Sequence, residues 1–314
     1  MLNRPEIMTA ATPRTGRGAG PDFICVGAQK AGTRWLYDQL AFHPEFWMPP
    51  VKELHFFDGA RPGLRKAKRL KARIDKDLGK VNQMRTEDAA QPLRERDLRF
   101  VEGYLGLFTN KPLMKDKSAA IEAYARLFDE KGSDMTGDVT PAYSKLGDDA
   151  VEAIIERFPT VRVVFIVREP IERLWSALGM AARQSKSRVK QPVTPATLLK
   201  FANRKDVAGR SFPSRTIARW QAAAPAGQFA YYFFDDLRTD PFGLRSRILT
   251  FLGADPDLPS GDLEPGFNRK SKSAKLTLTD ELRDTLVRYF ADEIRTCADT
   301  LGGRAVEWRK KYNL

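Results

Sequence analysis

Residues 27–34 have the types and spacing of a loop that binds an anion. The segment reads GAQKAGTR and combines two glycines, two cationic side chains and a hydroxyl group. Glycine lets the backbone approach a ligand closely, and successive backbone N–H groups that lead into a helix form a cradle for phosphate. The segment therefore predicts a binding site for a phosphorylated ligand.

Two predicted elements would position this loop. The apolar run FICV at residues 23–26 consists of strand formers, which predicts a buried strand that Gly27 ends. Leu36 and Leu40 recur at helical spacing, which predicts a helix from Thr33 to Phe42. The loop would then lie at a helix N-terminus, where unpaired donors and the helix dipole favour an anion.

The loop differs from the one that binds nucleoside triphosphates, which has a Lys and a Ser or Thr directly after its second glycine. Here Gly32 is followed by Thr33 and Arg34, and Lys30 comes two residues earlier. The usual contacts with a triphosphate and its magnesium ion are therefore missing. A kinase or another nucleotide-dependent enzyme remains a second hypothesis, but the sequence lacks the Lys-Ser/Thr pair and the magnesium carboxylate that it would need.

A second cluster of chemical groups is the segment KELHFFD, which begins at Lys52. Residues two apart in an extended segment share a side, so Glu53 and His55 would both reach one cleft, and either could act as a base. The plainer alternative is that Phe56 and Phe57 anchor the segment, that Glu53 pairs with Lys52, and that His55 is a buried histidine with satisfied hydrogen bonds.

Together, GAQKAGTR and KELHFFD resemble the sulfotransferases that use 3′-phosphoadenylyl sulfate (PAPS), and among them the branch that contains the glycosaminoglycan sulfotransferases. The sequence VRVVFIVREPIERLWSALGM at residues 161–180 is similar to that family's second nucleotide motif. In that motif an arginine and a serine eight residues later hold the 3′-phosphate, and Arg168 and Ser176 match both positions. The alternative is that Arg168 pairs with Glu169 or Glu172 and that Ser176 faces solvent.

The resemblance implies transfer of a sulfuryl group from PAPS to a hydroxyl or amine of an acceptor such as a carbohydrate, without a metal. Adenosine 3′,5′-bisphosphate would be the nucleotide product. Glu53 would be the base, and His55 would be a neighbour that orients it or stabilises charge. The alternative is that His55 is the base. Lys30 would neutralise charge on the leaving phosphate oxygen while the loop holds the 5′-phosphosulfate.

The resemblance also implies a set of nucleotide-binding residues. The cluster NRKSKSAK at residues 268–275 is similar to a Lys-Ser-Lys-Gly-Arg loop that covers the nucleotide, although such a cluster is also typical of a solvated loop. Trp35 would lie either against the adenine or in the core. The full set is Lys30, Ala31, Gly32, Thr33, Arg34, Trp35, Arg168, Ser176, Lys270, Ser271 and Lys272.

The resemblance also implies a single α/β domain with a central parallel sheet flanked by helices and a P-loop-like phosphosulfate-binding loop, and the residue pattern agrees with an α/β sheet. A helical pattern at residues 149–158 precedes the β-branched run at residues 161–167, and this order is typical of a parallel sheet with right-handed crossovers. Residues 229–234 predict another buried strand. Thr279 is a predicted N-cap of a long final helix at residues 280–301.

The domain boundaries follow from composition. We expect residues 1–20 to be a disordered tail and residues 21–314 to form the sulfotransferase domain. Within this domain the basic run and polar stretch at residues 61–97 predict a solvated helix face or an insertion, with contact to a polyanionic acceptor as the alternative. Residues 183–210 predict a partly helical lid over the cleft.

The charge balance sets a third hypothesis. Lys plus Arg number 53 against 40 Asp plus Glu, and the net charge of +13 attracts polyanions non-specifically, so a non-enzymatic polyanion-binding protein is an alternative. The sequence shows no recognisable nucleic-acid module, and we expect no specific nucleic-acid partner. Cys25 and Cys297 are expected to be buried thiols. The two expected thiols, together with the absence of a recognisable secretory signal or membrane span in the sequence, predict a cytoplasmic protein.

Overall fold

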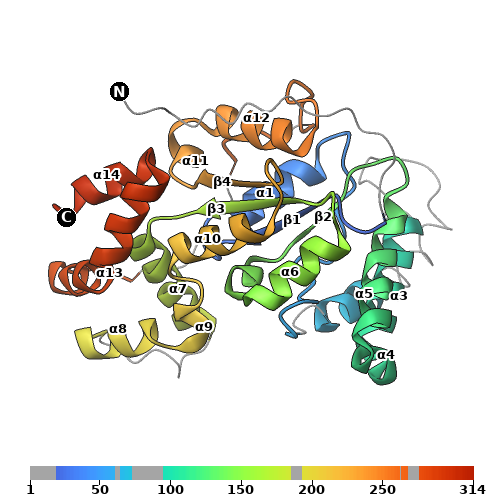
Figure 1. Ribbon diagram of the computed structural model, residues 1–314, viewed down its shortest axis with the longest axis horizontal. Helices are drawn as coiled ribbons and strands as arrows, with labels where there is room; N and C mark the ends of the chain where they lie inside the picture. Colours follow the sequence, from blue (N-terminus) through green and yellow to red (C-terminus); the bar gives the residue numbers. More distant parts are fainter. Residues whose placement is uncertain (1–18, 61–63, 73–94, 185–192, 262, 268–275) are drawn as a thin grey trace.

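The centre of the structure, a computed structural model, is a four-stranded parallel sheet. The structure describes residues 19–60, 64–72, 95–184, 193–261, 263–267 and 276–314. The strands have the order β2-β1-β3-β4, with β1 (Phe23–Gly27), β2 (Gly137–Val139), β3 (Arg162–Val167) and β4 (Phe229–Phe233). In Figure 1 the sheet crosses the middle of the molecule, with α12 above it and α6 and α10 below. The predicted fold class is confirmed.

Helices connect the strands, as parallel pairing requires. The predicted helices after Gly32 and before β3 are confirmed. The elements outside the sheet are α1 (Thr33–Ala41), α3 (Glu95–Thr109), α4 (Lys111–Lys115), α5 (Lys117–Arg126), η1 (Leu127–Lys131), η2 (Pro141–Lys145), α6 (Asp148–Arg157), α7 (Pro170–Gln184), α8 (Pro195–Ala202), α9 (Lys205–Ala208), α10 (Pro213–Ala223), α11 (Asp236–Thr239), α12 (Pro241–Leu252), α13 (Asp280–Leu301) and α14 (Arg304–Lys311).

The two central strands are almost fully buried, as their apolar sequences predict. Phe23 lies opposite Gly137 of β2 and opposite Arg162 of β3. A Cβ atom on Gly137 would collide with the ring of Phe23, so this position requires glycine. Because the strands pair in parallel, the C-terminal ends of β1, β2 and β3 lie at the same end of the sheet.

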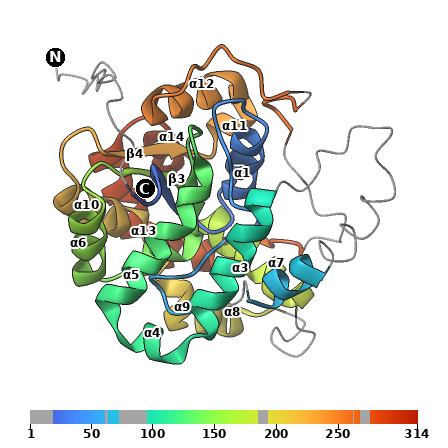
Figure 2. The ribbon, with the colours of Figure 1, turned by 90° about the vertical axis from the view of Figure 1, so that its right-hand side faces the viewer.

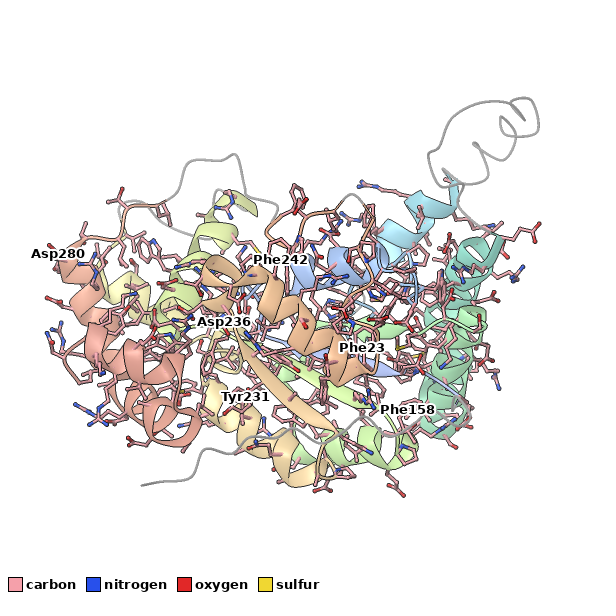
Figure 3. All side chains as sticks on the ribbon, turned by 90° about the horizontal axis from the view of Figure 1, so that it is seen from above. Phe23, Phe158, Tyr231, Asp236, Phe242 and Asp280 are labelled. Carbon is pink, nitrogen blue, oxygen red and sulfur yellow. The ribbon has the colours of Figure 1, made fainter. Side chains whose placement is uncertain are left out.

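The prediction that residues 229–234 form a buried strand is correct for the strand and wrong for its burial. Every residue of β4 is half-buried, and β4 is an edge strand that pairs with β3 alone, whereas β2 at the opposite edge is fully buried. The Tyr231 hydroxyl of β4 donates a hydrogen bond of 3.3 Å to the carbonyl oxygen of Leu301. Tyr231 and Asp236, both labelled in Figure 3, thus lie where β4 and α11 meet the C-terminal helices.

The C-terminal part differs from the prediction at its end. Thr279 caps α13 through its side chain, which accepts from the Leu282 N–H, and α13 ends at Leu301 as expected. The chain then forms one more helix, α14, so α13 is not the final helix. The Nε atom of Arg304 on α14 donates to Asp236 at 2.9 Å, which ties this helix to the end of β4.

Helices α3, α4 and α5 lie together on the side of the molecule that faces the viewer in Figure 2. Residues 64–72 of the predicted basic insertion are helical, and its last residues, from Glu95, begin α3. The remainder of that insertion, residues 61–63 and 73–94, lies outside the described residues, as do residues 1–18 of the predicted tail. Gly20, also assigned to the tail, is buried, and its carbonyl oxygen accepts a 2.9 Å hydrogen bond from Lys131.

The described residues of the predicted lid are partly helical. Residues 183 and 184 end α7, and α8 and α9 lie within the rest of the segment, while residues 185–192 lie outside the described residues. Cys25 and Cys297 are both buried free thiols, as predicted. Among the described helices, none combines the length and the apolar character needed to cross a membrane.

Candidate active site

The anion loop lies between the end of β1 and the first turn of α1. Gly32 is the N-cap of α1 and has a left-handed backbone with φ of 85°. A Cβ atom there would lie 3.1 Å from the ring of Phe234, so Gly32 meets both a backbone and a packing requirement. The N–H groups of the first turn have no intrahelical acceptor and are free to bind an oxyanion.

Lys30 is half-buried in this loop and also has a positive φ, of 73°, a conformation that non-glycine residues rarely adopt. Burial lowers the pKa of the Lys30 ammonium, and the nearby charges of Arg183 and Arg168 lower it further. Thr33 is buried, whereas Arg34 is exposed and pairs with Asp38 at 2.8 Å. The loop thus gathers positive charge around free backbone donors.

Arg168 extends from the C-terminal end of β3 to the anion loop. Its Nη1 atom donates a 2.7 Å hydrogen bond to the Lys30 carbonyl oxygen, and its Nη2 atom lies 3.2 Å from Glu172. The guanidinium also stacks on Phe234, with its carbon 4.6 Å from the ring centroid. Its Nε atom is buried and has no partner in the described part of the chain, which leaves one donor for a ligand such as a phosphate.

One of the two ion pairs considered as alternatives for Arg168 is present. Glu172 binds Arg168, whereas Glu169 is buried and accepts hydrogen bonds from the N–H groups of Ile171 and Glu172 at the start of α7. Ser176 is half-buried two turns further along α7. Arg168 therefore pairs with Glu172 and at the same time contacts the anion loop, so the ion pair is compatible with a role of Arg168 in binding an anionic ligand.

Glu53 and His55 are brought together in the structure. The His55 Nε2 atom lies 3.4 Å from Glu53 Oε2, and its Nδ1 atom lies 3.0 Å from both carboxylate oxygens of Asp58. The Lys52 ammonium donates to Glu53 at 3.2 Å. The segment is not extended, since φ is 65° at Glu53 and 56° at His55, so our reason for placing them on one side was wrong although they do contact each other.

The pKa values of this cluster move in opposite directions. Burial opposes the charged form of His55, but the hydrogen bonds to Asp58 and Glu53 outweigh it and raise the pKa of His55 to about 9. Burial likewise opposes ionised Glu53, but His55 and Lys52 lower its pKa to about 2. At neutral pH the cluster therefore holds an imidazolium between two carboxylates.

A buried aspartate that was not among the site residues selected from the sequence anchors this segment. Asp138, in β2, accepts hydrogen bonds from Thr140 at 2.6 Å, Tyr143 at 2.8 Å and Tyr124 at 3.0 Å. The Tyr143 oxygen in turn accepts a 3.0 Å hydrogen bond from the Phe56 N–H. Burial raises the pKa of the Asp138 carboxyl, and the three hydroxyl donors oppose that shift. The sequence signal for Asp138 was an acidic residue in a strand with a threonine two residues away on each side, Thr136 and Thr140.

Lys145 is a further residue that sequence reasoning did not select. Its Nζ atom lies 3.5 Å from Asp58 Oδ2, so η2 supplies a cation behind the Asp58–His55 pair. The side chain of Asp58 is only 1% exposed, which strengthens both interactions because little water competes for them. The end of β2 thus positions residues 55–58 next to the loop that follows β1.

Trp35 and the predicted covering loop are the remaining residues that we assigned to the nucleotide. Trp35 is 1% exposed, and its indole N–H donates to the Pro265 carbonyl oxygen at 2.7 Å. The structure supports the core position for Trp35, and contact with an adenine would require the segment at Pro265 to move. The predicted covering loop with Lys270, Ser271 and Lys272 lies outside the described residues.

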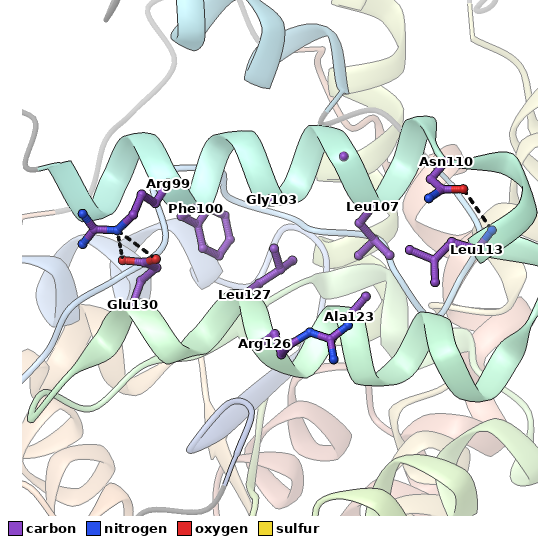
Figure 4. Close-up of a pocket in the computed structure, with 11 residues that line it drawn as sticks. Arg99, Phe100, Gly103, Leu107, Asn110, Leu113, Ala123, Arg126, Leu127 and Glu130 are labelled. Atoms are coloured by element: carbon purple, nitrogen blue, oxygen red, sulfur yellow. Dashed lines mark hydrogen bonds and ion pairs between the residues drawn. The ribbon is translucent and has the colours of Figure 1, made fainter.

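A pocket of about 400 Å³ lies elsewhere, between α3 and α5 (Figure 4). Of its three charged lining residues, Arg99, Arg126 and Glu130, the first and the last pair with each other at 2.8 Å. Apolar side chains such as Phe100, Leu107 and Leu127 form much of the remaining lining. None of the predicted site residues lines this pocket, so it is separate from the candidate active site.

Comparison with known proteins identifies the family of this chain. The profile of the sulfotransferase family matches residues 21–257, which include the loop, the Glu53–Asp58 segment and Arg168. The chain therefore belongs to the sulfotransferase family, and the family predicted from its motifs is confirmed.

Two individual proteins illustrate the similarity. The chain is 26% identical to carbohydrate sulfotransferase 15 of Mus musculus over 187 residues, which are 53% of this chain and 28% of that protein. The match therefore spans less than a third of that relative's length. The crystal structure of a sulfotransferase from Alicyclobacillus acidocaldarius has a TM-score of 0.58 and 19% identity, and covers 93% of this chain and 100% of that one. This second likeness supports the fold.

Proposed function

We propose that this protein transfers a sulfuryl group from PAPS to a hydroxyl or amine of an acceptor, and that the acceptor is a carbohydrate. The observation that carries the proposal is the position of Arg168, whose guanidinium binds the Lys30 carbonyl while its buried Nε atom has no partner in the described part of the chain. A 3′-phosphate next to a bound 5′-phosphosulfate would use that donor.

We assign the following roles in this reaction. The free amides at the start of α1, with Thr33 and Arg34, bind the phosphosulfate, and Arg168 and Ser176 bind the 3′-phosphate. The acceptor oxygen forms a bond to sulfur as the bond between sulfur and the 5′-phosphate oxygen breaks. Lys30 neutralises the negative charge on that leaving oxygen, and adenosine 3′,5′-bisphosphate is released.

Glu53 takes the proton from the acceptor in this proposal. It is ionised at neutral pH, and His55 holds its carboxylate at 3.4 Å while Asp58 holds the other side of the imidazole. A low pKa makes a carboxylate a weak base, so the ion pair with His55 is expected to loosen when the acceptor binds. His55 remains the competing base.

The acceptor assignment has its own support. The resemblance of KELHFFD to glycosaminoglycan sulfotransferases and the partial match to a carbohydrate sulfotransferase both favour a sugar hydroxyl. We also propose that residues 21–314 act as one domain and that residues 183–210 cover the acceptor. Family membership favours this function over the kinase and the non-enzymatic polyanion-binding protein.

Isothermal titration calorimetry tests the proposal against both alternatives. In the presence of a chelator, the protein should bind adenosine 3′,5′-bisphosphate more tightly than ATP or a heparin fragment. ATP binding that requires magnesium would favour the kinase, and heparin binding without bisphosphate binding would favour the polyanion-binding protein. Either result would overturn the proposed function.

A further inference from the structure

Within the described residues, the carboxylate of Glu172 on α7 pairs with three cations. Its Oε2 atom accepts from Arg168 at 3.2 Å and from Arg238 at 2.9 Å, and its Oε1 atom accepts from the Lys311 ammonium at 3.0 Å. Burial opposes ionised Glu172, but Lys311 and Arg238 outweigh it and lower the pKa of Glu172 to about 2. Glu172 is therefore ionised at neutral pH, and its one negative charge is divided among these cations.

Lys311 reaches Glu172 from the end of α14, 139 residues further along the chain. The next residue, Tyr312, donates its hydroxyl to Glu169 at 3.1 Å. Glu169 follows Arg168 directly and accepts a 2.8 Å hydrogen bond from the Glu172 N–H. The end of α14 is thus hydrogen-bonded to both glutamates that follow Arg168.

Helix α14 is itself fixed to the strand end that supports Arg168. Trp308 of α14 is buried and packs edge-on against Phe233, the last residue of β4, with ring centroids 5.4 Å apart. The next residue, Phe234, provides the ring on which the Arg168 guanidinium stacks. The end of β4 therefore positions both the helix that carries Lys311 and the Arg168 side chain.

The guanidinium of Arg168 is held at two of its nitrogen atoms. Nη1 donates to the Lys30 carbonyl oxygen and Nη2 to Glu172, while the buried Nε has no partner in the described part of the chain. Of these two acceptors only the Glu172 carboxylate is charged. How strongly Glu172 neutralises Arg168 therefore decides how much positive charge remains for a phosphate.

We propose that Lys311 is a positioning residue for the 3′-phosphate, because it binds one oxygen of the Glu172 carboxylate and so leaves more of the Arg168 charge available to that phosphate. This inference rests on the proposed function. Without Lys311, the same carboxylate would neutralise more of the Arg168 charge and would repel a phosphate bound beside it. Residue 311 lies beyond residues 21–257, which the family profile matches, so this contact is not part of the family match.

The ratio of the affinities for adenosine 3′,5′-bisphosphate and 5′-AMP tests this role, because the two ligands differ only in the 3′-phosphate. Calorimetry should show that Lys311→Gln lowers the ratio about three- to fivefold, the scale of a partly exposed ion pair, with AMP affinity unchanged. Lys311→Arg keeps the charge and should retain the wild-type ratio. Lys310→Gln removes the same charge from the exposed neighbouring residue and should bind both nucleotides as the wild type does.

A double-mutant cycle tests whether Lys311 acts through Glu172. In a Glu172→Gln background the carboxylate charge is gone, so adding Lys311→Gln should leave the affinity ratio as it is in Glu172→Gln alone. A further three- to fivefold fall in the double variant would show that Lys311 acts by another route, and would overturn the inference.

Two other results would overturn the inference without contradicting the proposed function. One is an unchanged ratio in Lys311→Gln. The other is an equal loss for both nucleotides together with a lower melting temperature, which would show that Lys311 serves the fold and not the 3′-phosphate. A wild-type protein that does not prefer the bisphosphate to AMP would instead contradict the proposed function.

Discussion

The guanidinium of Arg168 donates a 2.7 Å hydrogen bond from Nη1 to the main-chain carbonyl of Lys30, across 138 residues of sequence. This bond joins the end of β3 to the loop after β1, so the two segments that we propose bind the nucleotide are one structural unit. Lys30 has a positive φ of 73°, and the Arg168 bond helps to hold that conformation. A change at Arg168 should therefore affect both ends of the nucleotide.

Arg168→Ala is expected to weaken adenosine 3′,5′-bisphosphate binding by about 1.5–3 kcal/mol more than binding of 5′-AMP, because only the bisphosphate loses a charge-assisted contact with its 3′-phosphate. Calorimetry with both nucleotides measures the difference. Some loss for AMP is also expected, since the Lys30 carbonyl loses its partner. Arg247→Gln, an exposed arginine on α12, is the charge-matched control. Equal losses for the two nucleotides would contradict the assignment.

Ser176→Ala tests the same phosphate without disturbing the loop. Ser176 lies on α7 and not in the anion loop, so AMP binding should remain at the wild-type level. Bisphosphate binding should fall by about 0.5–1.5 kcal/mol, the usual effect of one hydrogen bond. A variant that binds both nucleotides as the wild type does would remove Ser176 from the site.

Lys30→Ala is expected to lower kcat by roughly 10²–10³ with a much smaller change in the affinity for bisphosphate. The reason is that the ammonium is needed most when the leaving oxygen gains charge, and an interaction made mainly in the transition state affects turnover. Steady-state kinetics together with calorimetry separate the two quantities. Normal turnover with only a raised Michaelis constant would make Lys30 a binding residue alone.

Glu53→Gln keeps the shape of the side chain and removes its basicity. Bisphosphate affinity should be retained, while the transfer rate should fall by about 10²–10⁴ once an acceptor is in hand. His55→Ala is expected to fold and to retain part of the activity, because its role is to orient Glu53. A dead His55→Ala beside a fully active Glu53→Gln would reverse the two assignments.

The pH dependence of kcat distinguishes the same two bases. The pKa of His55 is raised to about 9, so His55 is protonated at neutral pH and loses its proton as the pH rises through about 9. If protonated His55 orients Glu53, kcat should fall above about pH 9. If neutral His55 is the base, kcat should instead rise toward that pH. The stability that His55 adds follows the same sign, being complete below pH 6.5 and lost through about pH 9.

Tyr143→Phe tests the anchor of the catalytic segment. The tyrosine hydroxyl donates to buried Asp138 and accepts from the Phe56 N–H, so its removal leaves the Phe56 donor without this partner. We expect a loss of about 1–3 kcal/mol in the free energy of unfolding, measured with denaturant, and a lower kcat with unchanged bisphosphate affinity. Tyr232→Phe, whose hydroxyl binds the Arg247 carbonyl near the surface, should leave kcat unchanged.

Several parts of the fold and the site follow from local patterns in the sequence. The run FICV, the glycines at 27 and 32 and the spacing of Leu36 and Leu40 predicted β1, the anion loop and α1. These features depend on residues close together in the chain, where periodicity and glycine placement express the backbone directly. The burial of β1 and β3 was predicted for the same reason.

Other features depend on residues that are far apart in the chain. The half-burial of β4 depends on what packs against this edge strand, since β2 at the opposite edge is fully buried, and such packing is not encoded in the apolar pattern of one strand. The network that links Asp138 and Tyr143 to Phe56, and the contact of Arg210 with Gln29, join segments 87 and 181 residues apart. The local sequence determines which reactive side chains are present. Which of them meet is decided by the tertiary structure, because parallel pairing of the strands brings their C-terminal ends, and the loops that follow them, close together.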